Sequence, residues 1–144
     1  MTVFVDTNVL VYARDASEPD KQPRAAAWVE HLWRTRTARL SFQVLQEYYA
    51  TTTRKLEPGL SPDQARADVR NLLAWRPVPV GAQVIEAGWS VEDRFGLSCW
   101  DALIVAAARI AGCEYLLTED LQHGAELDGL QVLNPFRVEA GSLR

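Results

Sequence analysis

Short apolar runs alternate along this chain with longer segments that have the apolar spacing of helices. The run VFV at 3–5 leads directly into Asp6, and the run EYLL at 114–117 leads into the sequence TED at 118–120. Strands that alternate with helices predict a parallel sheet with helices on both faces. Ligands of such sheets lie beyond the carboxyl ends of the strands. We therefore expect the acids that follow these two runs to meet at one edge of the sheet.

The predicted elements follow this alternation over the whole chain. Trp28 and Leu32 mark the apolar face of the first long helix, and Gly112 is placed to end the last one. The tail after about Phe136 is expected to fray. In chain order we expect a strand at 2–6, a helix at 7–14, a helix at 21–36, a strand at 38–41, a helix at 42–54, a helix at 61–75, an extended segment or short strand at 77–80, helices at 82–95 and 98–111, and strands at 114–117 and 130–133.

The length of 144 residues, 48% of them apolar, is that of a single domain with a substantial core. The first residues show no basic and apolar leader, and no apolar run approaches the ~18 residues of a membrane helix. Cys99 and Cys113 fit no metal or redox spacing, and His31 and His123 form no His-based metal motif. We expect one domain over residues 1–144, a cytoplasmic location and no membrane association.

The formal net charge of −4 argues against a simple basic nucleic-acid binder. The charge is uneven, because residues 1–76 hold 11 basic and 9 acidic residues, whereas residues 77–144 hold 4 and 10. Such a distribution suits an acidic metal site beside Arg-bearing helices, and it is also what an ordinary solvated surface shows. Charge alone leaves both interpretations open.

Asp6 lies in VFVDTNVLVY, with no Lys or Arg nearby in sequence to neutralise it. Any of Asp6, Thr7 and Asn8 can cap the following helix, so capping is one interpretation of this triplet. A helix needs one cap, however, and three candidates leave a carboxylate for another role. Asp120, in LLTEDLQHG, has the corresponding alternative of a loop acid that caps a short helix, and spacing does not choose between it and Glu119.

Asp101 lies at the start of an almost uniformly apolar helix in LSCWDALIVAAARIAG, three residues after Ser98. A capping box of Ser98 with Asp101 and a functional carboxylate are both compatible with this position. Glu47 lies beside Val44 on the edge of an apolar helical stripe, and periodicity alone assigns it to solvent. Neither acid is therefore identified by its own spacing.

Four motifs taken together resemble the PIN-domain nucleases, and within them the VapC toxins of bacterial type II toxin–antitoxin pairs. The motifs are VDTNVLVY, LSFQVLQEYY, LSCWDALIVAAA and LLTEDLQHG, in the family's order and at familiar spacing over residues 2–136. The family's small polar positions fall on Thr7, Asn8 and Thr118, and Glu119 is not one of its acids. The family's four acidic positions fall on Asp6, Glu47, Asp101 and Asp120.

The resemblance implies a three-layer α/β/α sandwich with a small parallel sheet of four or five strands. It implies endonucleolytic cleavage of RNA, with the four carboxylates as catalytic residues that bind one or two Mg²⁺ or Mn²⁺ ions. Asn8 and Thr118 are expected to orient those carboxylates or water from a second shell. The implied partners are an RNA substrate, a cognate antitoxin that occludes the cleft, and a second copy of the chain in a homodimer.

Other protein classes with an acid after a buried strand fit the sequence less well. A haloacid-dehalogenase-like phosphatase has a second Asp two residues after the first, where this chain has Asn8. A receiver domain has a Lys after a late strand, but the lysines here are Lys21 and Lys55, and no glycine-rich nucleotide motif is present. Two alternatives stay open: a housekeeping RNA-processing PIN nuclease, and a PIN fold that only binds RNA or protein.

Overall fold

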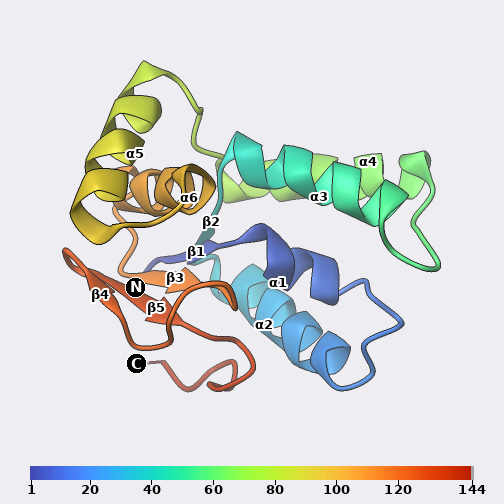
Figure 1. The fold of residues 1–144 in the computed structure, drawn as a ribbon. Coiled ribbons are helices and arrows are strands. Elements are labelled where there is room, and N and C mark those ends of the chain that lie inside the picture. The colour runs from blue at the N-terminus through green and yellow to red at the C-terminus, as the bar shows by residue number, and fades with distance from the viewer. Residues whose placement is uncertain (144) are drawn as a thin grey trace.

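A computed structural model describes residues 1–143 of the chain as a five-stranded sheet between layers of helices (Figure 1). The strands are β1 (Val3–Val5), β2 (Ala38–Arg39), β3 (Tyr115–Leu117), β4 (Glu126–Leu127) and β5 (Leu130–Leu133). Their order is β2-β1-β3-β5-β4, and every neighbouring pair is parallel except β4 with β5. The predicted α/β/α sandwich with a small, mostly parallel sheet is confirmed.

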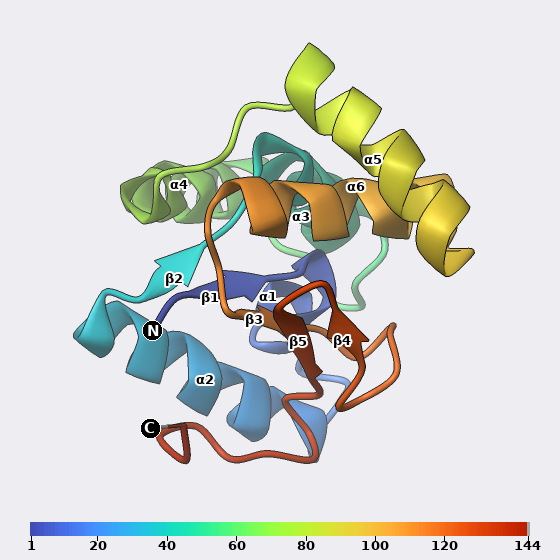
Figure 2. The same ribbon diagram turned by 90° about the vertical axis from the view of Figure 1, so that its left-hand side faces the viewer.

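Helices cover both faces of this sheet. The helices are α1 (Thr7–Tyr12), α2 (Lys21–Thr35), α3 (Phe42–Arg54), α4 (Pro62–Leu72), α5 (Ala82–Phe95) and α6 (Cys99–Ile110), with a 3₁₀ turn η1 (Leu73–Trp75) that continues α4. Figure 2 shows α2 on one side of the sheet and α3, α4, α5 and α6 on the other. None of the helices within residues 1–143 has both the length and the apolar character to cross a membrane.

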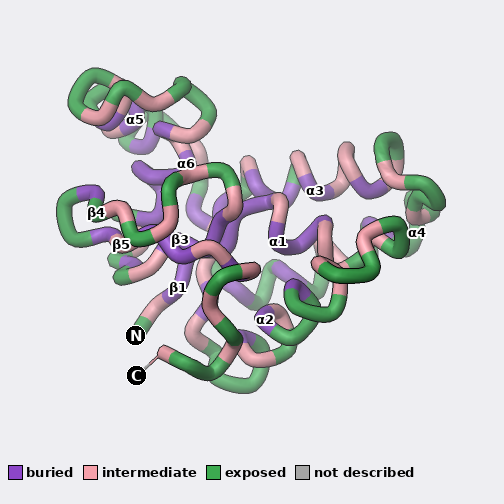
Figure 3. The backbone as a smooth tube through the Cα atoms, turned by 60° about the horizontal axis from the view of Figure 1, so that its bottom comes forward, coloured by how far each residue is buried: buried purple, intermediate pink, exposed green. Residues whose placement is uncertain are grey.

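The core is centred on the middle strands, which are buried on both faces (Figure 3). All three residues of β1 are buried because β2 and β3 flank it and helices cover it above and below, which explains its continuous apolar run. Helix α6 is also buried over most of its length, and its small Ala106 and Ala108 allow close packing. Gly88 of α5 lies so close to Leu103 of α6 that an added Cβ would lie 3.1 Å from its side chain.

Local sequence signals explain where several helices begin. Ser41 Oγ accepts a hydrogen bond from the backbone N of Val44 at the start of α3 (3.3 Å). Helix α4 begins with a complete capping box, in which Ser61 and Gln64 each accept from the other's backbone N. Side-chain acceptors in these places satisfy backbone N–H groups that have no partner within the helix.

The structure differs from the sequence prediction at the far edge of the sheet. Strand β4 was not predicted, because two residues carry no readable alternation. It forms a hairpin with β5 through Asp128 (φ 53°) and Gly129 (φ 91°), the Asp-Gly pair that a two-residue turn with positive φ favours. The segment 77–80, expected to be extended, contributes one parallel bridge between Val78 and Ser41.

The tail after about Phe136, which we expect to fray, makes contacts with the rest of the fold, and its fraying stays a prediction. The indole Nε1 of Trp28 donates to the carbonyl oxygens of Pro135 (3.2 Å) and Val138 (2.9 Å), which ties the chain after β5 to helix α2. Val138 and Leu143 are partly buried against the core. A buried Trp on a distant helix supplies these contacts, and no local pattern in the tail announces it.

Candidate active site

The carboxyl ends of β1 and β3 place Asp6 and Thr118 side by side. The two strands pair with Val5 opposite Leu117, so the residues that follow them are also neighbours. The backbone N of Asp6 donates to the carbonyl oxygen of Leu117 (3.0 Å), and Thr118 Oγ1 donates to Asp6 Oδ2 (2.8 Å). The central strand pair therefore fixes the position of the Asp6 carboxylate.

Asp6 is 6% exposed and accepts hydrogen bonds only from neutral groups within residues 1–143. Its Oδ1 accepts from the backbone N of Thr7 (2.7 Å), so it does cap α1 with one oxygen. Burial raises the pKa of Asp6 to about 6, against the lowering effect of the hydrogen bonds from Thr118 and Thr7. The charges of Asp120 and Glu47 raise this pKa further. The cap thus leaves a buried charge without a cationic partner.

Asn8 connects the start of α1 to the loop after β3. Its Nδ2 lies 3.3 Å from Asp6 Oδ2, 3.1 Å from Thr118 Oγ1 and 3.2 Å from Asp120 Oδ2. Its Oδ1 accepts from the backbone N of Glu119 (3.2 Å). One amide therefore lies between two of the predicted acids, and the orienting role of Asn8 and Thr118 stays a prediction that these contacts support.

Glu47 reaches the same place from helix α3. Its Oε2 accepts from Thr7 Oγ1 (2.8 Å), and its Oε1 accepts from Gln43 Nε2 (3.1 Å). Both neighbouring donors are neutral, as they are at Asp6. Sequence reasoning did not single out Gln43, although its spacing of four residues from Glu47 on one helix is the signal that could have identified it.

Asp101 lies in the first turn of α6, where Ser98 Oγ accepts from its backbone N (3.2 Å). The capping box stops there, because within residues 1–143 the Asp101 carboxylate accepts no hydrogen bond. Partial burial raises the pKa of Asp120, an effect that the hydrogen bond from Asn8 opposes. The charges of Asp101, Glu119 and Glu47 raise it further, so Asp120 lies close enough to feel the charges of Asp101 and Glu47.

The structure separates the two adjacent acids that sequence spacing could not distinguish. Asp120 is bonded to Asn8, beside the other carboxylates. Glu119 instead pairs with Lys21 Nζ (2.9 Å) and accepts from the Tyr12 hydroxyl (2.8 Å). Glu119 is therefore neutralised within the fold, whereas Asp120 is not.

The four predicted acids, Asp6, Glu47, Asp101 and Asp120, are called the acidic edge below, and their chemistry fits a hard divalent cation. The carboxylates offer only oxygen atoms as metal ligands, which Mg²⁺ and Mn²⁺ prefer. Burial first, and then mutual repulsion, raise the pKa values of Asp6 and Asp120, and a bound cation would favour their charged forms. Within residues 1–143, no group of three His, Cys, Asp or Glu side chains is already arranged to hold a metal ion. The fit is therefore one of charge and donor type, and not of a preformed set of three ligands.

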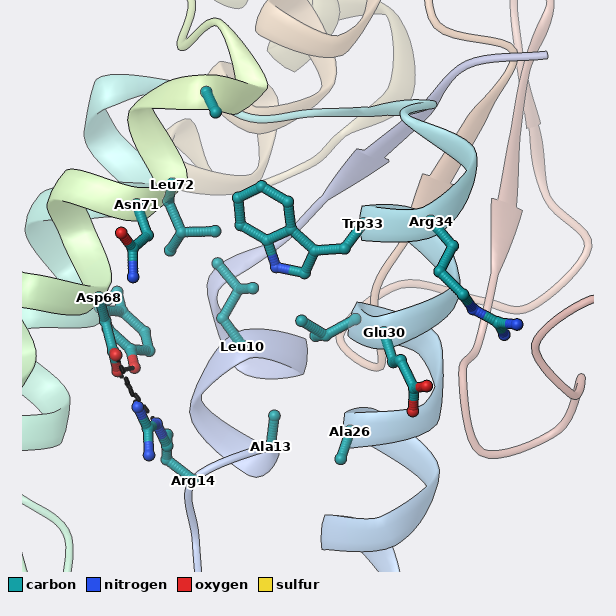
Figure 4. Close-up of a pocket in the computed structure, with 13 residues that line it drawn as sticks. Leu10, Ala13, Arg14, Ala26, Glu30, Trp33, Arg34, Asp68, Asn71 and Leu72 are labelled. Atoms are coloured by element: carbon teal, nitrogen blue, oxygen red, sulfur yellow. Dashed lines mark hydrogen bonds and ion pairs between the residues drawn. The ribbon is translucent and has the colours of Figure 1, made fainter.

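A separate cavity of about 840 Å³ lies between α1, α2 and α4 (Figure 4). None of the predicted site residues lines it, and sequence reasoning missed it. Arg14 and Asp68 face each other at this cavity, with Arg14 Nη2 2.6 Å from Asp68 Oδ1 and Nε 3.0 Å from Oδ2. The Tyr48 hydroxyl also donates to Asp68. This carboxylate therefore has a bidentate cationic partner.

Comparison with known proteins identifies a family and a fold. Residues 3–125 match the PIN domain family. A comparison with curated protein sequences found no match.

Three similar solved structures cover most of this chain. A chain of a toxin–antitoxin complex from Klebsiella pneumoniae is 18% identical, with 94% of this chain and 98% of that chain covered and a TM-score of 0.64. VapC20 of Mycobacterium tuberculosis, a sarcin–ricin loop cleaving toxin, is 24% identical, with 80% of this chain and 87% of that chain covered and a TM-score of 0.62. A chain of VapBC2 from Rickettsia felis, bound to a DNA fragment from its promoter, is 19% identical, with 92% of this chain and 97% of that chain covered and a TM-score of 0.62. At these identities the likeness shows a shared fold.

Proposed function

This chain belongs to the PIN domain family, and on that premise we propose that it is a divalent-metal-dependent endoribonuclease. One observation carries the proposal: hydrogen bonds through Thr7, Asn8 and Thr118 connect the carboxylates of Asp6, Glu47 and Asp120 where the parallel strands β1 and β3 end. The charge of Asp101 acts on Asp120, and Asp6, the most buried of the four, has no cationic partner within residues 1–143. A module that only bound an RNA polyanion would gain nothing from such a cluster, because the acids would repel the phosphates.

In the proposed site, Asp6 and Asp101 would hold one ion, and Glu47 and Asp120 would hold a second. Bound Mg²⁺ or Mn²⁺ supplies the positive charge that the cluster lacks and lowers the pKa of water for attack on phosphorus. The protein's own donors keep the acids in place. Thr118 and Asn8 hold Asp6 and Asp120, so that these carboxylates meet an ion with little loss of side-chain entropy.

We further propose that the chain acts as the toxin of a toxin–antitoxin pair, with RNA as substrate, an antitoxin protein as partner and a homodimer as its assembly. The fold is shared with a chain of a toxin–antitoxin complex and with the toxin VapC20, which supports the toxin role and the antitoxin partner. Expression of the chain without a partner should stop bacterial growth, and the Asp6→Asn variant should not. Equal growth of the two strains would favour a housekeeping nuclease instead.

The direct test is RNA cleavage by the purified chain with Mn²⁺, with Mg²⁺ and with EDTA. Cleavage should require the metal and leave a 5′-phosphate and a 3′-hydroxyl, because water is the nucleophile. Asp6→Asn should cut RNA at least about a hundredfold more slowly. Substitution of a residue that only supports a metal ligand costs up to about a hundredfold, and loss of a ligand should cost at least as much. Asp93→Asn, at an exposed position of α5, is the matched control and should cut at the wild-type rate. Undiminished cleavage in EDTA, or products with a 2′,3′-cyclic phosphate, would contradict the proposal.

A further inference from the structure

We propose that Lys21 is a positioning residue for the metal site: it holds Glu119 and thereby fixes the loop that presents Asp120. This inference rests on the proposed function, because it concerns the same site. Glu119 is not one of the four acids that the resemblance identifies, so its ion pair is a contact additional to the proposed ligands.

The side chain of Glu119 is held from outside the acidic edge. Lys21 Nζ lies 2.9 and 3.2 Å from its two carboxylate oxygens, and the Tyr12 hydroxyl donates to Oε1 (2.8 Å). The Lys21 ammonium also lies 4.8 Å from the ring centroid of Tyr12 and 5.2 Å from that of Phe136. The two rings pack edge to face, with centroids 5.2 Å apart. Two aromatic rings therefore confine the ammonium beside Glu119.

The same loop is held from inside by the residues of the acidic edge. Asn8 accepts from the backbone N of Glu119 (3.2 Å) and donates to the carboxylate of Asp120 (3.2 Å). The backbone N of Asp120 donates to Thr118 Oγ1 (3.1 Å). The side chain of Asp120 is exposed although its carboxyl is partly desolvated, so packing alone does not fix it. Its position depends on these hydrogen bonds and on the ion pair that holds the preceding residue, Glu119.

The location of Lys21 supports a role outside its own helix. Lys21 is the first residue of α2, where a positive charge opposes the helix dipole. The preceding Asp20 makes no side-chain capping hydrogen bond, and the first turn contains no acid. The favourable partner of this ammonium is therefore Glu119, from a distant part of the chain. An ion pair as exposed as this one adds little to global stability, so its effect should be local.

The sign of one measurement distinguishes positioning from simple electrostatics. Lys21→Met removes a positive charge near the acidic edge, and by Coulomb's law alone this should tighten the binding of Mn²⁺. If Lys21 instead fixes the loop, the same change frees Asp120 and should weaken Mn²⁺ binding. Methionine keeps most of the length of the apolar side chain and removes the ammonium that lies over Tyr12 and Phe136.

The experiment is Mn²⁺ titration calorimetry on the full chain. Lys21→Met should bind Mn²⁺ about tenfold more weakly, the lower end of what changes around metal ligands cause. Lys21→Arg, which keeps the ion pair, should bind within about twofold of wild type. The matched control is Arg94→Met, which breaks the ion pair of Arg94 with Asp128 (2.8 Å). Asp128 lies in the turn between β4 and β5, at the amino end of β5, whereas the acids follow the carboxyl ends of β1 and β3. This variant should bind Mn²⁺ as wild type does.

Two further measurements complete the test. The first is made without metal, and the second asks whether Lys21 acts through Glu119. In EDTA, hydrogen exchange at the Glu119 amide should be faster in Lys21→Met than in Arg94→Met, because the loop is released. In a Glu119→Gln background, Lys21→Met should weaken Mn²⁺ binding no further, because Lys21 acts through Glu119. An additional loss in the double variant would mean that Lys21 acts directly, and would overturn the proposal.

The outcomes separate this proposal from the function on which it rests. Wild-type protein that neither binds Mn²⁺ nor cuts RNA would overturn both. Wild-type protein that does both, with Lys21→Met binding as tightly as Arg94→Met or more tightly, would leave the nuclease function standing and overturn only the positioning role.

Discussion

Helix α1 separates two carboxylates that the fold treats in opposite ways. Asp6 caps its first turn and accepts hydrogen bonds from neutral groups alone. Asp68 of α4 meets Arg14, just beyond the other end of α1, in a bidentate ion pair, and also accepts from Tyr48. Asp68 therefore has its cation within the fold, whereas Asp6 lacks one, and this difference supports the proposal that Asp6 binds a metal ion.

The cost of the unpartnered charge can be estimated. The pKa of Asp6 is raised from 3.8 to about 6, and each unit corresponds to ~1.4 kcal/mol of preference for the protonated form. Ionised Asp6 therefore lowers the stability of the metal-free fold by about 3 kcal/mol at neutral pH, a large share of the ~5–15 kcal/mol typical of domains. A divalent cation bound at this edge would offset that cost.

The largest expected effect is an opposite response of the two acids to neutralisation. In EDTA at pH 8, Asp6→Asn should be more stable than wild type by up to about 3 kcal/mol, because it removes a buried charge. Asp68→Asn should be less stable by about 1–2 kcal/mol, because the half-exposed Arg14 loses its charged partner. Urea unfolding of the three proteins measures both differences. A loss of stability in Asp6→Asn would mean that its capping bond outweighs the cost of its charge.

The pH dependence of stability gives a second test of the unpartnered charge on Asp6. Because the folded pKa of Asp6 lies above its unfolded value, its contribution to stability is fully present below pH ~3.8 and is lost as the pH rises through about 6. Wild-type protein in EDTA should therefore lose stability between about pH 4 and pH 7 relative to Asp6→Asn. Melting curves of the two proteins at matched pH values test this. Parallel profiles would mean that Asp6 does not titrate in this range.

A smaller effect distinguishes capping from metal binding at the start of α6. Free Mn²⁺ at about 100 times its Kd should stabilise wild type by about 2.7 kcal/mol. Asp101→Asn should lose most of that gain but melt near wild type in EDTA, since within residues 1–143 its carboxylate accepts no hydrogen bond. Ser98→Ala should cost about 1 kcal/mol with or without metal, because Ser98 supplies the cap. If Asp101→Asn gains as much from Mn²⁺ as wild type does, Asp101 does not bind the metal.

The sequence alone predicted those parts of the site that follow from regular structure. Parallel strands bring their carboxyl ends to one edge, and this rule correctly placed Asp6 beside Thr118. Glu47 and Asp101 could not be found in this way, because each lies on a helix whose rotation about its axis depends on tertiary packing. Only the family resemblance identified them, and the structure then brought their charges within reach of Asp120.

Contacts between distant segments account for what sequence reasoning missed. Glu119 and Asp120 are adjacent acids, and Lys21, roughly a hundred residues away, decides which one is neutralised. The pair of Arg14 with Asp68 likewise joins two helices that no local pattern relates. Apolar spacing predicts which face of an element is buried, but it does not specify the element against which that face packs.

The smallest effect is expected from the hydroxyl of Tyr48, which completes the neutralised acid. Burial first, and then the hydrogen bond to Asp68, raise the pKa of Tyr48, so it remains a neutral donor at any ordinary pH. Tyr48→Phe removes one buried hydrogen bond but leaves Asp68 paired with Arg14, and should cost about 1 kcal/mol in urea unfolding. RNA cleavage and Mn²⁺ binding should be unchanged, because Tyr48 contacts none of the four site acids. A loss of Mn²⁺ affinity in this variant would show that Asp68 and the proposed metal ligand Asp6 are coupled through α1, and the contrast between the two acids would then fail.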